Sequence, residues 1–127
     1  MQLLLDTNIL IALSSDWRPA LDARIFGAIE ATDNSCFVSV VSLWEIAIKR
    51  RIGKLNTRLT AIEVADYFDA MGLPLLAITR DHVLAELESE PKTRDPFDRL
   101  LLAVCQVERL RLITLDRALA AHALAWR

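Results

Sequence analysis

Residues 2–8, Gln-Leu-Leu-Leu-Asp-Thr-Asn, decide the fold class. The run from Gln2 to Leu5 is largely apolar and too short for a core helix, so we predict a buried strand there. Asp6 follows the strand directly, and a helix is predicted from Asn8 to Ser14. A buried strand that leads straight into a helix is the unit from which parallel sheets with helical layers are built.

The same alternation of short apolar runs and longer amphipathic segments continues along the chain. Further strands are predicted at Cys36–Ser39, Leu75–Ile78 and Leu112–Leu115, with Leu124–Trp126 as a candidate edge strand. Further helices are predicted at Pro19–Ala31, Val41–Ile52, Thr60–Met71, Arg80–Glu88, Pro96–Arg109 and Arg117–Ala123. Strands that are apolar on both faces need helices on both sides. We therefore expect an α/β fold, a three-layer α/β/α sandwich around a central, mainly parallel sheet of four to five strands.

Local signals support several of these helix ends. Pro19 suits the first turn of its helix. Thr60 and Glu63 match a capping box, in which each side chain binds the other residue's backbone N–H. Gly53 and Gly72 are predicted to stop the helices that precede them.

Length and composition set the protein class. The chain has 127 residues, of which 54% are hydrophobic and 25% charged, so it is expected to fold as one domain over residues 1–127. Its formal net charge of −2 argues against general electrostatic binding of nucleic acids. Cys36 and Cys105 match no metal or redox spacing and are expected to be buried free thiols in a reducing cytosol. Neither a signal peptide nor a membrane span is recognisable, so a soluble, cytoplasmic protein is expected.

Acidic residues follow the predicted strands. Parallel strands end at one edge of a sheet, where sites form in open α/β folds, and four acids are expected to converge there: Asp6, Glu45, Asp98 and Asp116. Taken singly, most of these acids also fit structural roles, because Asp is a favoured helix cap and complements the helix dipole. Glu45 lies in an apolar stretch, where an unpaired carboxylate is costly, although Lys49 four residues on could pair with it.

Carboxylates that converge in this way call for a cation. They repel one another, which raises pKa values unless a positive charge lies between them. Hard oxygen ligands suit Mg²⁺ or Mn²⁺, which can activate water and stabilise charge on a phosphate. His82 and His122 match no metal-ligand spacing and are expected to be ordinary exposed histidines. No glycine-rich phosphate loop and no GxSxG motif is present.

The sequence resembles the PIN-domain nuclease family, and within it the VapC-type toxins of bacterial toxin–antitoxin pairs. Four stretches carry the resemblance, in family-like order and spacing: residues 3–8, 39–49, 95–101 and 112–116. The resemblance implies a PIN-like sandwich with Asp6, Glu45, Asp98 and Asp116 as catalytic, metal-binding acids. It also implies accessory roles for Thr7, Asn8, Asp95 and Ser42. Close relatives often have His at the position of Thr93, so a histidine role there is not carried over.

The family's activity and partners follow from the same resemblance. Relatives cleave RNA with Mg²⁺ or Mn²⁺, leaving 5′-phosphate and 3′-hydroxyl ends, and many are homodimers inhibited by an antitoxin. We therefore expect a metal-dependent endoribonuclease that forms a homodimer and binds a cognate antitoxin. The alternatives are a catalytically inactive PIN-like module that binds RNA or protein, and a nuclease acting on DNA, which only 2′-hydroxyl contacts would distinguish.

Basic residues beside the acids are candidates for binding the RNA backbone. Five lie between residues 49 and 58 with no acid among them, and others flank Asp95 and Asp98. The predicted substrate-binding residues are Lys49, Arg50, Arg51, Arg94 and Arg99. A solvated helix end that complements the dipole explains Arg50 and Arg51 equally well. Packing is expected to account for Trp17, Trp44 and Trp126.

Two surfaces are predicted to bind other chains. Helices 60–71 and 80–88 are expected to supply apolar area for self-association, including Tyr67, Phe68 and Met71. At the acidic pocket, an antitoxin tail is expected to insert an Arg or Lys that replaces the charge of the metal.

Overall fold

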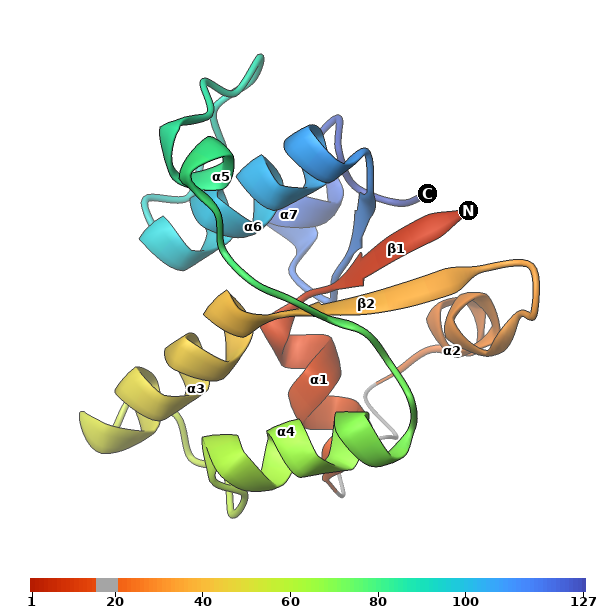
Figure 1. Cartoon of the computed structure of the whole chain (residues 1–127), viewed down its shortest axis with the longest axis vertical. Coiled ribbons are helices and arrows are strands. Elements are labelled where there is room, and N and C mark those ends of the chain that lie inside the picture. Colours follow the sequence, from red (N-terminus) through yellow and green to blue (C-terminus); the bar gives the residue numbers. More distant parts are fainter. Residues whose placement is uncertain (16–20) are drawn as a thin grey trace.

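The computed structural model describes residues 1–15 and 21–127, and its centre is a four-stranded parallel sheet in the order β3-β2-β1-β4 (Figure 1). The strands are β1 (Gln2–Leu5), β2 (Ser35–Ser39), β3 (Leu75–Leu76) and β4 (Arg111–Ile113). In the central strand, Leu4 lies opposite Phe37 of β2 and Leu112 of β4. The predicted parallel sheet is confirmed, and β1, the strand that opens the chain, lies inside it.

Helices cover both faces of this sheet. They are α1 (Thr7–Ser14), α2 (Ala23–Glu30), α3 (Val40–Arg51), α4 (Ala61–Ala70), α5 (Arg80–Leu84), α6 (Pro96–Glu108) and α7 (Arg117–Ala120). Figure 1 shows α1, α2 and α4 on one side of the sheet and α5, α6 and α7 on the other, while α3 extends from the end of β2. The predicted three-layer α/β/α arrangement is therefore confirmed.

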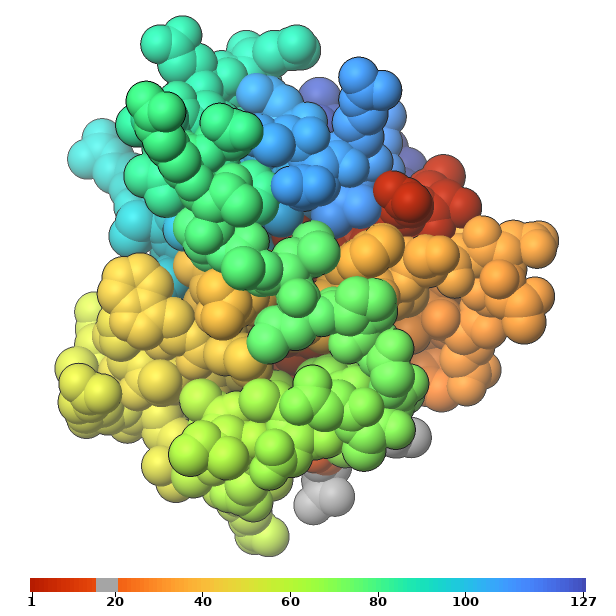
Figure 2. Space-filling model, viewed as in Figure 1, coloured from red at the N-terminus to blue at the C-terminus, as the bar shows by residue number. Residues whose placement is uncertain are grey.

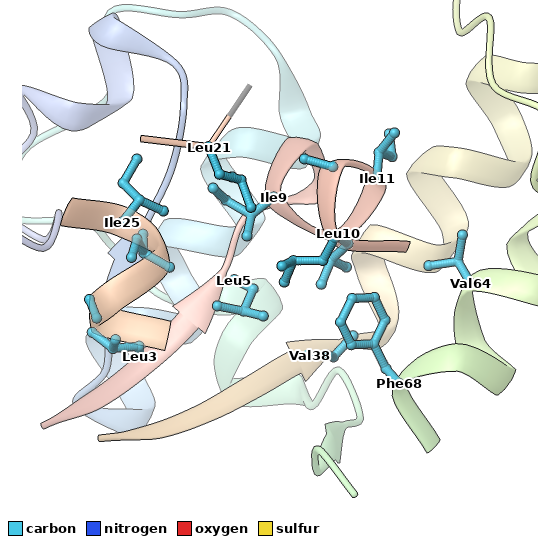
Figure 3. Close-up of a cluster of buried hydrophobic side chains, with 14 of the residues drawn as sticks. Leu3, Leu5, Ile9, Leu10, Ile11, Leu21, Ile25, Val38, Val64 and Phe68 are labelled. Atoms are coloured by element: carbon cyan, nitrogen blue, oxygen red, sulfur yellow. The ribbon is translucent and has the colours of Figure 1, made fainter. Parts of the chain in front are cut away.

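The alternation of side chains along β1 divides the core in two. Leu3 and Leu5 pack into one cluster with Ile9, Leu10 and Phe68 (Figure 3). Leu4 points to the opposite face and packs into the second cluster, with residues of α6, β4 and α7. Successive residues of a strand face opposite sides, so a strand that is apolar throughout holds both layers to the sheet.

Most predicted helix ends are confirmed to within a residue or two. Thr60 and Glu63 form the predicted capping box of α4, and Gly53 and Gly72 both have a φ of 76° after their helices. The predicted start of the second helix was wrong. Asp22 caps α2 by accepting the N–H of Ile25 at 2.8 Å, so the helix begins at Ala23. Pro19 and Trp17 lie outside the described residues.

Helix α5 was predicted to continue through Glu88, and this prediction was wrong. The helix ends at Leu84, and the following backbone is bound by α6 instead. The amide of Gln106 donates to the carbonyl of Glu86 at 2.9 Å and accepts the N–H of Glu88 at 3.2 Å. These tertiary hydrogen bonds replace the helical ones, which a local reading of the sequence cannot anticipate.

Three other predicted elements are also shorter than expected. Helix α7 ends at Ala120 rather than residue 123, and β3 ends at Leu76 rather than residue 78. The candidate edge strand at residues 124–126 is reduced to one parallel bridge between Leu112 and Ala125. Leu112 donates to Leu124 at 2.9 Å and accepts from Trp126 at 2.8 Å, so two hydrogen bonds close the sheet edge.

Both histidines are buried, so the expectation of exposed side chains was wrong. The Nδ1 atom of His82 accepts the N–H of Thr79 at 3.0 Å, and its Nε2 lies 2.8 Å from Oε1 of Glu108. His122 uses one ring nitrogen for the carbonyl of Ser89 at 2.7 Å and the other for a backbone N–H at 3.1 Å. His82 therefore caps the start of α5 and contacts α6, whereas His122 binds two backbone groups.

The predictions for the tryptophan and cysteine side chains hold in part. Trp44 was expected to pack, but it is 58% exposed. Its ring approaches that of Phe97 edge-on, with 5.3 Å between the two centroids. Trp126 is half-buried beneath Arg24. Both cysteines are free, Cys105 buried and Cys36 only half-buried. In the described part of the chain, no helix has the length and apolarity needed to cross a membrane.

Candidate active site

The carboxyl ends of the strands surround a pocket of about 250 Å³. Asp6 comes from the end of β1, Glu45 from α3, Asp95 and Asp98 from the start of α6, and Asp116 from the segment after β4. The remaining lining residues are Thr7, Asn8, Ile11, Lys49, Lys54 and Leu55. The structure therefore brings together all four acids of the predicted quartet and the accessory acid.

Asp6 is the most deeply placed of these acids, with 3% of its surface exposed. One carboxylate oxygen accepts the N–H of Thr7 at 2.7 Å, which caps α1, and the other accepts the hydroxyl of Thr114 at 2.5 Å. Burial, and to a lesser degree the charges of Asp98 and Glu45, raise the pKa of Asp6 to about 6. The carboxylate thus caps a helix, and its ionised form is disfavoured by burial and by the neighbouring acids.

Thr114 is a site residue that the sequence analysis missed. Its hydroxyl donates to Asp6 and accepts the N–H of Asp116 at 3.0 Å, so one buried side chain connects two of the acids. A threonine is common in a strand, which is why it gave no signal by itself. The available signal was its place at the end of the predicted strand, two residues before Asp116.

Glu45 is held by hydroxyl and ammonium groups. Its Oε1 accepts the hydroxyl of Thr7 at 2.6 Å, and the Ser42 hydroxyl lies 3.0 Å from that of Thr7. Its Oε2 contacts the ammonium of Lys49, the partner suggested by the spacing of four residues. The carboxylate is 6% exposed, so these contacts replace the water that burial removes.

Lys49 contacts a second acid as well. Its ammonium lies 3.1 Å from Oδ2 of Asp95, while Oδ1 of Asp95 caps α6 through the N–H of Phe97 at 2.8 Å. Burial acts to lower the pKa of Lys49, but the hydrogen bonds and charges of Glu45 and Asp95 outweigh it and raise that pKa. Lys49 therefore ties the last turn of α3 to the start of α6.

The other two acids each lie at the start of a helix, Asp98 in the first turn of α6 and Asp116 at the cap of α7, and both line the pocket. Asp98 accepts the hydroxyl of Thr93 at 3.1 Å, and burial together with the charges of Asp95, Glu45 and Asp116 raises its pKa to about 6. Asp116 caps α7 by accepting the N–H of Ala118 at 2.8 Å. The capping interpretation and the acidic-site interpretation of these residues are therefore compatible.

Asn8 has a structural contact rather than a free side chain. Its carbonyl oxygen accepts the N–H of Leu115 at 3.3 Å, which holds the start of α1 against the segment after β4. The predicted accessory residues thus divide by contact. Thr7, Ser42 and Asp95 belong to the network of hydrogen bonds and ion pairs around Glu45. Asn8 instead binds the backbone of the segment after β4.

The predicted substrate-binding residues are dispersed. Lys49 lines the pocket together with Lys54, and Arg51 and Arg94 are exposed nearby in sequence. Arg50 donates to the carbonyl of Thr57 at 3.4 Å. Arg99 turns away, pairing with Glu90 at 3.0 Å and donating to the carbonyl of Ala85 at 3.1 Å. Arg99 therefore holds the segment after α5 against α6.

The donor set of the pocket suits a hard divalent cation. All its acidic ligand atoms are carboxylate oxygens, the preferred ligands of Mg²⁺ and Mn²⁺. Among the described residues, no three His, Cys, Asp or Glu side chains are already grouped as a cage for a metal. The pocket therefore offers the ligand chemistry that such an ion prefers.

Comparison with protein families decides the family. The sequence model of the PIN domain family matches residues 3–124. This range includes the sheet from Leu3 onward and every acid of the pocket. The chain belongs to the PIN domain family. Comparison with curated proteins finds no match.

Solved structures show the same PIN fold. A chain of a toxin–antitoxin complex from Klebsiella pneumoniae is 22% identical, with a TM-score of 0.61 over 98% of this chain and 95% of that one. A chain of VapBC2 from Rickettsia felis, bound to a DNA fragment from its promoter, is 18% identical, with a TM-score of 0.63 over 91% and 88%. At these identities the likeness establishes the arrangement of the PIN domain, and the predicted PIN-like sandwich is confirmed.

Proposed function

We propose that this PIN domain is a divalent-metal-dependent endoribonuclease and the toxin of a toxin–antitoxin module. The observation that carries the proposal is the convergence of Asp6, Glu45, Asp98 and Asp116 on one pocket at the carboxyl edge of the sheet. A purely structural role would not require four capping or helical acids to face a common space, because their mutual repulsion opposes folding.

The quartet would hold Mg²⁺ or Mn²⁺, directly or through water. When bound, the ion would supply an activated water and stabilise charge on the scissile phosphate. The chain's own contribution is to orient the ligands. Thr7 donates to Glu45, Thr114 to Asp6 and Thr93 to Asp98, so three hydroxyls fix three carboxylates before any substrate arrives.

Binding of RNA would use the positive charges around this pocket. Lys49 and Lys54 line it, and Arg51 and Arg94 are exposed on the segments that flank it in sequence. Cations beside an acidic metal site suit a phosphate backbone that passes over it, and such contacts carry no base specificity. Arg99 is not part of this proposal, because Glu90 already neutralises its charge.

An assay of RNA cleavage by the purified chain tests the function. We expect cleavage of single-stranded RNA with Mg²⁺ or Mn²⁺, and loss of cleavage with excess EDTA. A matched DNA strand in the same assay separates the two nuclease alternatives, since only RNA presents 2′-hydroxyls. Intact RNA under all conditions, with the strand still bound, would support the catalytically inactive module instead.

An antitoxin is the proposed regulator of the same pocket. The acids give it a negative interior, so an inserted Arg from a partner could replace the charge of the metal through paired hydrogen bonds. The structural relatives named above include toxin–antitoxin complexes, and this supports the proposal without identifying a partner. In the cleavage assay, the protein encoded by the neighbouring reading frame should suppress activity at equimolar concentration.

We also propose that the chain forms a homodimer through the face that carries α3 and α5. Figure 2 views the molecule from the side on which these helices are visible. Val83 and Leu84 of α5 are 58% and 63% exposed, and Trp44 of α3 is exposed as well. The predicted contribution of Phe68 was wrong, because its ring is buried in the core; Tyr67 packs beside it, and Met71 alone of the three is exposed.

Sedimentation velocity tests this homodimer. At micromolar concentration we expect a species of about twice the chain mass of 14.3 kDa. Leu84→Lys should shift the population to monomer, because a charge in an apolar interface stays unpaired. Ile62→Lys, which changes an exposed apolar residue of α4 rather than of α3 or α5, is the matched control and should remain dimeric. A wild-type chain that sediments only as monomer would exclude the homodimer.

A further inference from the structure

Lys49 occupies a defined place among the acids of the pocket. Its ammonium contacts Oε2 of Glu45 and lies 3.1 Å from Oδ2 of Asp95. The ring of Phe97 lies beneath it, with the centroid 5.6 Å from Nζ. Two carboxylates and an aromatic face therefore surround the charge, and 28% of the side chain remains exposed. Lys54 also lines the pocket. Among the described residues, however, the ion pairs to acids of the pocket are both made by Lys49.

We propose that Lys49 is a positioning residue whose ammonium acts as the resident cation of the acidic pocket. It holds Glu45 and Asp95 in place while no divalent ion is bound, and it lowers the affinity of the pocket for that ion. The inference rests on the proposed function, because it concerns the same metal site. It assigns to Lys49 a role distinct from a contact with the RNA backbone.

The first argument is the balance of charge. Five carboxylates line the pocket, and Glu45 is nearly buried. Without Lys49, the remaining hydrogen bond to Glu45 would be that of the Thr7 hydroxyl, which is neutral. A buried carboxylate that loses its charged partner destabilises the fold. Lys49 therefore stabilises the metal-free protein.

The second argument is competition for Glu45. Both of its oxygens already have partners, Thr7 on Oε1 and Lys49 on Oε2. A divalent ion that approaches Glu45 meets a like charge in direct contact with the same carboxylate. Binding of an ion to Glu45 therefore has to open the Lys49–Glu45 pair.

Calorimetric titration of the full chain with MnCl₂ tests the proposal without an activity readout. Lys49→Met keeps a long unbranched side chain and removes the charge, and we expect the variant to bind Mn²⁺ about tenfold more tightly, equivalent to about 1.4 kcal/mol. In EDTA the same variant should melt several degrees below the wild type. Lys49→Arg keeps the charge on a side chain long enough to reach the same carboxylates, and it should bring both measurements back toward the wild-type values.

Arg51→Met is the matched control for net charge, because it removes an exposed cation two residues further along α3. Its Mn²⁺ affinity should stay within about twofold of the wild type, since exposed charges are screened by solvent. Equal or weaker Mn²⁺ binding by Lys49→Met than by the wild type overturns the proposal for Lys49 alone. If neither protein binds Mn²⁺, the metal site itself is absent and the proposed function fails as well.

A second measurement uses the wild-type protein and needs no stable variant. An ion-paired ammonium exchanges its protons slowly enough to give a ¹H–¹⁵N signal, which Lys49→Arg would assign by its absence. Titration with Mg²⁺ should shift or remove this signal as the pair opens, in step with the backbone amide signal of Asp98. A Lys49 signal that stays unchanged while the Asp98 amide reaches saturation would show that the ion and the ammonium do not compete.

Discussion

Asp6→Asn should reduce the rate of RNA cleavage by about 10³-fold or more, the loss typical when a preorganised charge-stabilising group is removed. Asn still accepts the N–H of Thr7 and so still caps α1, but it brings no charge to the proposed ion. The variant is therefore expected to fold. The measurement is single-turnover cleavage at saturating Mg²⁺ and Mn²⁺, with circular dichroism to verify the fold.

Asp22→Asn is the matched control for that experiment. Asp22 is the N-cap of α2, as Asp6 is of α1, but it is exposed and lies outside the pocket. Its replacement should leave the cleavage rate within about twofold of the wild type, as expected for a surface substitution. If folded Asp6→Asn retained near wild-type cleavage, Asp6 would have to be removed from the catalytic acids.

The same substitution should have the opposite effect on stability. Burial raises the pKa of Asp6 from its ordinary value of 3.8 to about 6, so the folded metal-free protein binds this proton more tightly than the unfolded chain does. Stability from this group is therefore present below pH 4 and is lost as the pH rises from about 4 to above 6. The shift corresponds to about 3 kcal/mol at neutral pH.

Thermal unfolding in EDTA at several pH values measures this effect. At pH 4.5 the protonated Asp6 resembles Asn, so wild type and Asp6→Asn should melt at similar temperatures. At pH 7 the variant should melt higher, by about 10 °C for a shift of this size. Mn²⁺ should then stabilise the wild type and not the variant, because the ion binds only the folded, charged pocket. A difference between the two proteins that does not change with pH would contradict the assignment of a strained charge to Asp6.

Together these two results would show a site built at the expense of the stability of the fold. Asp98 has its pKa raised to about 6 by burial and by three neighbouring acids, so the strain is shared. Thr114, Thr93 and Lys49 moderate it with hydrogen bonds or charge. Active sites commonly carry such destabilising charge, which is why their replacement can stabilise a protein while removing its activity.

The sequence by itself determined the sheet and the location of the site. The run Leu3 to Leu5 is apolar and is followed at once by Asp6, and these local features specify a buried strand that ends in a cap. Parallel strands share one carboxyl edge, so the order of strands and acids along the chain was enough to place Asp6 and Asp116 near each other. The pairing of Glu45 with Lys49 followed from helical spacing alone.

Only the tertiary structure decided which side chains complete the network. Thr114 and Asp6 are 108 residues apart, and Lys49 and Asp95 are 46 apart, so no local pattern joins them. Packing of α6 against the segment after α5 stopped that helix early and turned Arg99 toward Glu90. It also buried His82 beside Glu108. Capping and periodicity act within a few residues, whereas these contacts depend on how distant elements pack, and that information is spread over the whole chain.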